Sequence, residues 1–238
     1  MVSAWGRLVL TARLLSEESR DSSMLVYALG LLPADKNKDE LYQQLLILYF
    51  LNRSAEADQL LVKVPVNPEL IQELTSSLAI RATETTNAGL LEKVISMTNQ
   101  YQVPDRQKLI ARYQINYDIH TKQWKEMSAA VDQLLALKGT EVTGREITEY
   151  TYYINQYSED LIVIKRAIHW IKPLATVDGE LQSVYLNAYA TLLYKSGQYK
   201  EARQWTEKLL SLTVNNAGKE AGAKELMLVI NAKSGSDD

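Results

Sequence analysis

The chain is punctuated at nearly constant intervals, and this spacing constrains its fold more than any other feature. Successive breaks are separated by 35, 36, 35 and 34 residues. The break residues are Pro33, Pro68, Pro104, Gly139 and Pro173. A period of this length is typical of arrays of two-helix units, because neither helix of a unit buries its apolar face until the next unit stacks against it. The spacing therefore predicts an all-α array of helix pairs.

Each interval contains two helical patterns separated by a short polar turn. The turns are predicted at 16–22, 52–54, 84–87, 121–123, 157–159 and 196–198. The predicted units are 1–33, 34–68, 69–104, 105–139, 140–173 and 174–214. A thirteenth helix, about 218–232, has the polar face that the open end of such an array requires. We expect one helical-repeat domain over 1–232 and a disordered tail at 233–238.

Local signals agree with this division. Asn67 offers an N-cap acceptor and Pro68 a fixed φ, so a helix should begin at Pro68. Asp105 should place a carboxylate in the first turn of the next helix. The β-prone run 150–153 lies inside a helical pattern, where context should override propensity. An apolar helical stripe precedes the turn at 52–54, formed by Leu41, Leu45, Leu48 and Leu51.

Composition excludes several classes of protein. The chain has no cysteine, which removes disulfides, thiol nucleophiles, iron–sulfur clusters and thiolate zinc sites. Its 26 Lys and Arg are spread evenly among 29 Asp and Glu, so there is no basic cluster for nucleic acid. The longest apolar run, 45–51, falls far short of the ~20 residues that span a bilayer. Arg7 and Arg13 interrupt the apolar centre that a signal peptide would need.

No motif for catalysis stands out. The short motifs that bind phosphate, form a nucleophile elbow or bind zinc are absent. Asp118 and His120 could form a carboxylate–imidazole pair for proton transfer, but a histidine at a helix C-terminus also interacts with the terminal carbonyls. The acidic pairs 17–18 and 39–40 lie near predicted helix starts, where the dipole favours them. We expect no enzyme, no metal and no cofactor.

Tyrosine is the one unusual element of the composition. The chain has 14 Tyr against a single Phe, and 11 of the 14 fall in the first helices of units. Tyrosine gives a large contact area for little rotamer entropy and keeps a polar hydroxyl, so these rings are candidates for binding a partner. The alternative is that they fill packing positions between units. The candidate tyrosines are Tyr113, Tyr117, Tyr150, Tyr153, Tyr157, Tyr185 and Tyr189.

In the unit Val184–Val214, small residues stand in both helices, and a glycine and a tyrosine form the turn. The residues concerned are Ala190, Leu193, Gly197, Tyr199 and Ala202. This unit resembles a tetratricopeptide repeat, most closely over the run Leu192–Leu209. Weaker matches are Asn52, Ala57 and Leu61 in the second unit and Lys122, Trp124 and Val131 in the fourth, where Met127 replaces the small alanine.

The resemblance implies a right-handed superhelix of six antiparallel helix pairs and a capping helix, with the first helices lining a concave face. The Tyr-lined face is then predicted to bind a protein or peptide. Arg112 and Asn116 match positions where some members of the family clamp a peptide carboxylate. Because later units carry Glu149 and Ala188 at the corresponding positions, we do not predict a carboxylate receptor.

The last 60 residues, from Ala167 to Ile230, also resemble the helical region of thioredoxin-like proteins of Bacteroidetes. This resemblance implies an alternative function, an accessory helical domain of an envelope protein whose catalytic part lies elsewhere, and it favours the periplasm over the cytoplasm. The prediction is a non-enzymatic interaction scaffold with a protein or peptide partner, no nucleic acid and no membrane insertion. Self-association through the ends of the array is a further alternative.

Overall fold

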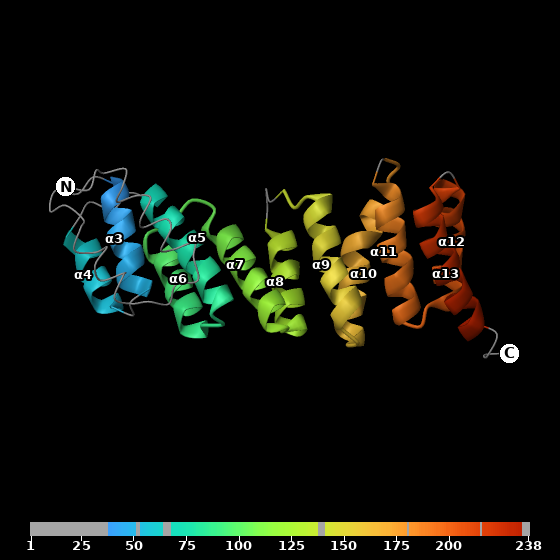
Figure 1. Ribbon diagram of the computed structural model, residues 1–238, viewed down its shortest axis with the longest axis horizontal. Helices are drawn as coiled ribbons and strands as arrows, with labels where there is room; N and C mark the ends of the chain where they lie inside the picture. The colour runs from blue at the N-terminus through green and yellow to red at the C-terminus, as the bar shows by residue number, and fades with distance from the viewer. Residues whose placement is uncertain are drawn as a thin grey trace. The chain divides into compact units, whose positions relative to one another are not determined.

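The computed structural model describes residues 38–50, 53–63, 68–137, 141–179, 181–214 and 216–234 (Figure 1). Within these ranges every regular element is an α-helix and there is no strand, which confirms the all-α prediction for this part of the chain. The chain divides into two compact units, 1–113 and 114–238. The unit predicted at 1–33 lies outside the described residues, as do Asn52, Asn67, Gly139 and the tail from 235 onward.

The first compact unit contains α3 (Lys38–Phe50), α4 (Ser54–Lys63), α5 (Pro68–Glu84), α6 (Ala88–Gln100) and the start of α7 (Arg106–Thr121). Helix α3 packs on α4 and α5, and α5 packs on α6. Between residues 45 and 49 every side chain of α3 is buried, which explains why its sequence is apolar all round rather than on one stripe. Helix α5 begins at Pro68, as predicted.

Tyrosine hydroxyls connect helices within this unit. Tyr42 forms a hydrogen bond with Ser77 at 2.7 Å, which joins α3 to α5. Tyr49 donates to Asp58 at 2.9 Å, and Lys93 pairs with the same carboxylate at 2.7 Å. Burial and the neighbouring Asp58 raise the pKa of Tyr49, so this phenol remains protonated. Here tyrosine serves packing, with its hydroxyl satisfied at the edge of the core.

The second compact unit contains the rest of α7 with α8 (Trp124–Ala136), α9 (Gly144–Tyr157), α10 (Leu161–Ala175), α11 (Gln182–Lys195), α12 (Tyr199–Thr213) and α13 (Ala217–Ser234). Helix α10 contacts α8, α9 and α11, while α12 lies against α11 and α13. In Figure 1 these helices run from yellow-green to red. The β-prone run 150–153 is helical, as its context predicted.

The same short turn joins the two helices of several pairs. A backbone N–H just before the second helix donates to a carbonyl five residues earlier, at the end of the first. The four bonds are Arg53 N to Leu48 O, Asn87 N to Ala82 O, Gln123 N to Asp118 O and Gln198 N to Leu193 O, each 2.8–2.9 Å. This repeated geometry explains the predicted turns at 84–87, 121–123 and 196–198. Gly197 adopts φ +80°, a conformation that favours glycine.

Two predicted helix boundaries differ from the structure. Pro173 lies inside α10, which continues to Ala175, rather than ending the helix pair. The proline ring has a helical φ, but it removes the N–H that would bond to the carbonyl four residues earlier, and the helix ends two residues later. Asp105 precedes α7 with φ 53°, and its carboxylate pairs with Lys108 at 2.9 Å instead of entering the first turn.

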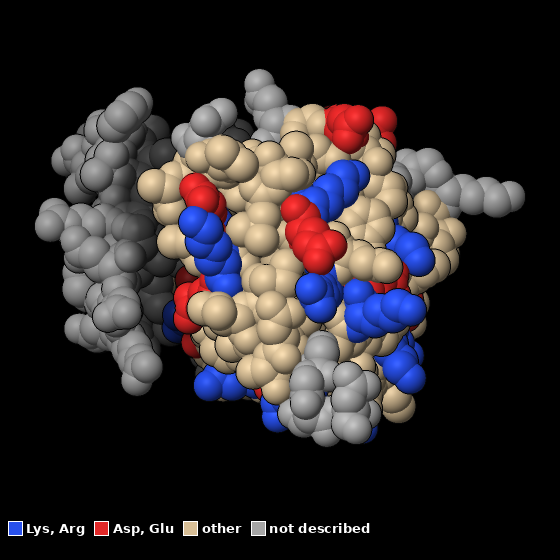
Figure 2. Space-filling view, turned by 90° about the vertical axis from the view of Figure 1, so that its right-hand side faces the viewer, with Lys and Arg blue, Asp and Glu red and all other residues tan. Residues whose placement is uncertain are grey.

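Helices α12 and α13 carry charges of both signs on the side shown in Figure 2. Arg203 pairs with Glu207, and Lys224 with Glu220, each one helical turn apart. The buried side of α13 is apolar and consists of Ala223, Leu226 and Ile230. The last described helix therefore has the amphipathic composition expected of a helix with only one face packed.

Candidate functional site

Four of the predicted partner-binding tyrosines are buried. Tyr113 is 8% exposed, and its hydroxyl forms a hydrogen bond with Ser76 at 2.9 Å. Tyr117 and Tyr150 are each 6% exposed. Tyr189 is fully buried, packs edge-on against Trp205 at 5.3 Å and donates to Glu201 at 3.1 Å. These four rings therefore contribute to the core and offer little surface to a partner.

The remaining predicted residues are placed in different environments. Tyr185 is half-buried, and its ring lies so close to Gly144 that a side chain at this glycine would meet the hydroxyl. Arg112 is half-buried, whereas Asn116 is exposed. The structure brings only Tyr153 and Tyr157 together at the surface.

Tyr153 and Tyr157 belong to a cluster of exposed and half-buried rings, which we call the aromatic row. It is formed by Trp124, Tyr157, Tyr153 and Tyr152. Tyr157 stacks on Trp124 with centroids 5.7 Å apart and planes at 10°. It also stacks with Tyr153 at 6.5 Å and 26°, while Tyr152 meets Tyr153 edge-on at 5.7 Å. Pairs of this kind contribute about 0.5–1.5 kcal/mol beyond area burial, so the rings hold one another in place.

The row is unusual because large aromatic side chains remain exposed in it. Tyr157 is 57% exposed and Tyr152 54%, while Trp124 and Tyr153 are half-buried. Among the described residues the hydroxyls of Tyr152, Tyr153 and Tyr157 have no hydrogen-bond partner. The contrast with the satisfied hydroxyls of Tyr49, Tyr113 and Tyr189 is clear, since those rings are buried and these are not. Exposed aromatic side chains gathered in one place make the row the candidate site of this structure.

The local sequence explains how α9 presents Tyr153 and Tyr157. Thr143 caps the helix in a reciprocal capping box with Glu146, which fixes where α9 begins. Ile147, Tyr150 and Ile154 form the buried face, at spacings of three and four residues. Tyr153 and Tyr157 follow each other one turn apart beside that face, so they project from the same side of the helix.

The end of α9 is held by a lysine from α11. The ammonium group of Lys195 donates to the carbonyls of Asn155 at 2.8 Å and Ser158 at 2.9 Å. It also pairs with Glu159 at 3.0 Å, and its side chain is only 14% exposed. A cation at this point satisfies carbonyls that the helix end leaves unpaired and complements the negative end of the dipole. The turn that carries Tyr157 is thereby fixed.

Helix α8, which supplies Trp124, is anchored to α10. Trp170 donates from its indole nitrogen to Asp132 at 2.7 Å. Arg166 pairs with the same carboxylate at 3.1 Å and donates to the Ser128 hydroxyl at 2.8 Å. These bonds connect side chains 38 residues apart and hold α8 in register with α10. Trp124 and Tyr157 therefore stack on each other from α8 and α9, and each of these helices is anchored to another helix by hydrogen bonds.

Asp118 and His120 do not form the pair considered from the sequence. The carboxylate of Asp118 is fully buried and accepts from Gln114 at 2.8 Å, whereas His120 is exposed. The second carboxylate oxygen of Asp118 has no hydrogen-bond partner. Burial raises the pKa of Asp118 to about 6, against the lowering effect of the Gln114 hydrogen bond, and the charge of Glu126 raises it further.

A shallow cavity of about 580 Å³ lies beside α12. It is lined by Lys200, Glu201, Gln204, Trp205 and Lys208. The ammonium group of Lys208 lies 5.4 Å from the centre of the Trp205 ring, within cation–π range. The ammonium group of Lys208 therefore already lies over the face of Trp205, the one aromatic ring that lines the cavity.

Neither a metal site nor a membrane span is found among the described residues. This part of the chain holds no group of three His, Cys, Asp or Glu side chains that could bind a metal ion. None of its helices combines the length and apolarity needed to cross a membrane. Asp39 and Glu40 fall in the first turn of α3, and the pair 17–18 lies outside the described residues.

The sequence predicted Tyr153 and Tyr157 as candidates, and the structure places Trp124 and Tyr152, which were not predicted as binding residues, beside them. The signal for Trp124 was its place directly after the turn at 121–123, where it begins α8. Comparison of the chain with protein-family models, with curated proteins and with solved structures gave no match. The case for a functional site therefore depends on the geometry of the aromatic row.

Proposed function

We propose that this chain is a non-enzymatic interaction scaffold that binds a protein or peptide partner through the aromatic row. The observation that carries the proposal is the stack of Trp124, Tyr157 and Tyr153 at the surface, of which Tyr157 is the most exposed ring; Lys195 and the α8–α10 contacts hold it. Tyrosine and tryptophan are enriched where binding energy concentrates, and rigid rings lose little entropy on binding.

The arrangement of helices supports the same class of function. In the proposed fold the helix pairs stack as a right-handed, tetratricopeptide-like superhelix. This proposal is supported by the backbone hydrogen bond that recurs in the turns, accepted by Leu48, Ala82, Asp118 and Leu193. Such arrays present extended surfaces and place binding residues on successive helices. In this arrangement α9 contributes the greater part of the binding surface.

The test uses the full chain as bait in extracts of the source organism, beside a Trp124→Ala/Tyr157→Ala variant. The matched control is Leu161→Ala/Ile162→Ala, which removes two exposed apolar side chains from α10 outside the row. A captured partner is identified and purified, and its affinity is measured by calorimetry. We expect the row variant to lose about tenfold or more in affinity, and the control to retain it.

Two results would contradict the proposal. One is a partner bound equally by the native chain and the row variant, which would place its site elsewhere. The other is equal loss in both variants with unchanged circular dichroism, which would show that the row has no special part in binding.

A further inference from the structure

Tyr157, at the centre of the stack, presents mainly its edge and its hydroxyl to a ligand. Tyr157 stacks with both Trp124 and Tyr153, so neighbouring rings engage its faces. A ligand that needs a free face of Tyr157, such as a cation or a flat ring, would have to break this stack. The exposed 57% of Tyr157 is better suited to a ligand that lies across the row and accepts hydrogen bonds from it.

Unpaired hydroxyls favour a ligand with unpaired carbonyls. Among the described residues, the hydroxyls of Tyr153 and Tyr157 bond to no other group. A polyproline II segment has no internal hydrogen bonds, so its carbonyls are free to accept from them. A helical ligand has its carbonyls already bonded, and a β-strand ligand needs a sheet edge, which the described residues do not provide.

The spacing along α9 matches such a segment. Tyr153 and Tyr157 are four residues apart, which corresponds to about 6 Å along a helix axis. A polyproline II chain advances about 6 Å in two residues. The hydroxyls of Tyr153 and Tyr157 can therefore donate to carbonyls two residues apart in the ligand. The edges of the two rings can contact the proline side chains of the ligand.

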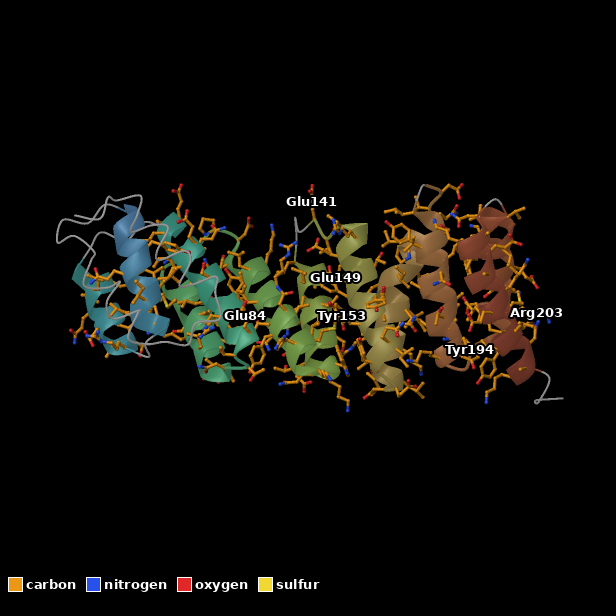
Figure 3. All side chains as sticks on the ribbon, viewed as in Figure 1. Glu84, Glu141, Glu149, Tyr153, Tyr194 and Arg203 are labelled. Carbon is orange, nitrogen blue, oxygen red and sulfur yellow. The ribbon has the colours of Figure 1, made fainter. Side chains whose placement is uncertain are left out.

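A carboxylate continues the same stripe. Glu149 lies one turn before Tyr153, and Figure 3 shows both on the same side of α9. Glu149 is exposed and has no ion-pair partner among the described residues, although Arg145 lies one turn further back. The stripe thus ends in an unpaired negative charge, which is complementary to an arginine or lysine in the ligand.

We propose that the aromatic row binds a proline-rich segment in the polyproline II conformation, with carbonyls that accept from Tyr153 and Tyr157 and a basic residue that pairs with Glu149. This inference rests on the proposed function, because it names the partner of the same site.

Calorimetry on the full chain tests the proposal with synthetic peptides. The probes are an oligoproline with arginine at either end, the same peptides with glutamine in place of arginine, and a flexible Gly/Ser peptide that keeps the arginine. The arginine oligoproline in one of its two orientations should bind most tightly. Tyr153→Phe/Tyr157→Phe keeps both rings and should weaken this binding roughly tenfold, because two hydrogen bonds are lost.

The Glu149→Gln variant removes the negative charge of residue 149 while keeping the size of its side chain. It should weaken binding of the arginine oligoproline several-fold and leave the glutamine peptide unaffected. The proposal is overturned if neither oligoproline orientation binds better than the flexible peptide, or if the Phe variant binds as tightly as the native chain. A captured partner that needs Trp124 and Tyr157 but contains no proline-rich segment would overturn this inference while leaving the scaffold function intact.

Discussion

Asp118 is a buried carboxyl group at a position where other helix pairs carry apolar side chains. The backbone carbonyl of Asp118 accepts the hydrogen bond that closes the turn before α8. The backbone carbonyls of Leu48, Ala82 and Leu193 do the same in the corresponding turns. The side chain is fully buried, and one of its oxygens has no partner. At neutral pH this carboxylate should therefore cost stability, because desolvation is only partly offset by Gln114.

The Asp118→Asn variant should stabilise the protein at neutral pH. The pKa of Asp118 is about 6 in the folded chain, against an ordinary value of 3.8. Between pH 3.8 and pH 6 the folded state therefore binds more protons than the unfolded state. Stability therefore falls as pH rises through this window, at up to about 1.4 kcal/mol per pH unit. Asparagine keeps the bond to Gln114 and does not ionise, so the gain should be about 1–3 kcal/mol at pH near 8.

Urea denaturation of both proteins at several pH values between about 5 and 8 measures this effect. The stability difference between variant and native chain should grow by about 1 kcal/mol from the acidic to the alkaline end. A difference that stays constant across the series would show that Asp118 does not titrate in this range, and the assignment would fail. Other groups titrate alike in both proteins and cancel.

At the scale of helices, Lys195 links α11 to the end of α9 and so to the aromatic row. The Lys195→Met variant keeps the aliphatic stem but removes the donor to the carbonyls of Asn155 and Ser158. Because both carbonyls are part-buried, their loss of a partner should cost about 1–3 kcal/mol of stability. The last turn of α9, with Tyr157, should also loosen.

Denaturant unfolding measures the first effect, and hydrogen exchange of the backbone amides at 154–158 reports whether the last turn of α9 opens more often. Lys165→Met is the matched control, because Lys165 is an exposed lysine of α10 with no described ion pair. Equal stability of the two variants would mean that the contacts of Lys195 add nothing to α9.

The sequence predicted the helices better than it predicted the site, for a physical reason. The turns at 84–87, 121–123 and 196–198 depend on residues close in sequence, and they close with local backbone bonds. The aromatic row depends on Trp124 of α8 meeting Tyr157 of α9, 33 residues later in the chain, which local patterns do not specify. Likewise, tyrosine spacing alone did not separate the buried Tyr150 from the exposed Tyr152 and Tyr157.

At the scale of the whole molecule, the two compact units each have their own core. Leu74 on α5 is fully buried in the first unit, and Ile164 on α10 is fully buried in the second. Because the stability of an array of helices is approximately a sum of local terms, a cavity in one unit should lower local stability there before it affects the other. The division into two units predicts which helices lose stability when a single core side chain is truncated.

Hydrogen exchange followed by mass spectrometry, on the native chain, Leu74→Ala and Ile164→Ala, tests this prediction. Each substitution removes a fully buried side chain and should cost about 2–5 kcal/mol in its own unit. Leu74→Ala should speed exchange in α5 and α6 while α11 and α12 keep their protection, and Ile164→Ala should do the reverse. If either substitution instead lowered protection uniformly from α5 to α12, the chain would unfold as one cooperative body and the two units would have no separate stability. The aromatic row lies in the second unit, so under the predicted behaviour Leu74→Ala should leave partner binding unchanged and Ile164→Ala should weaken it.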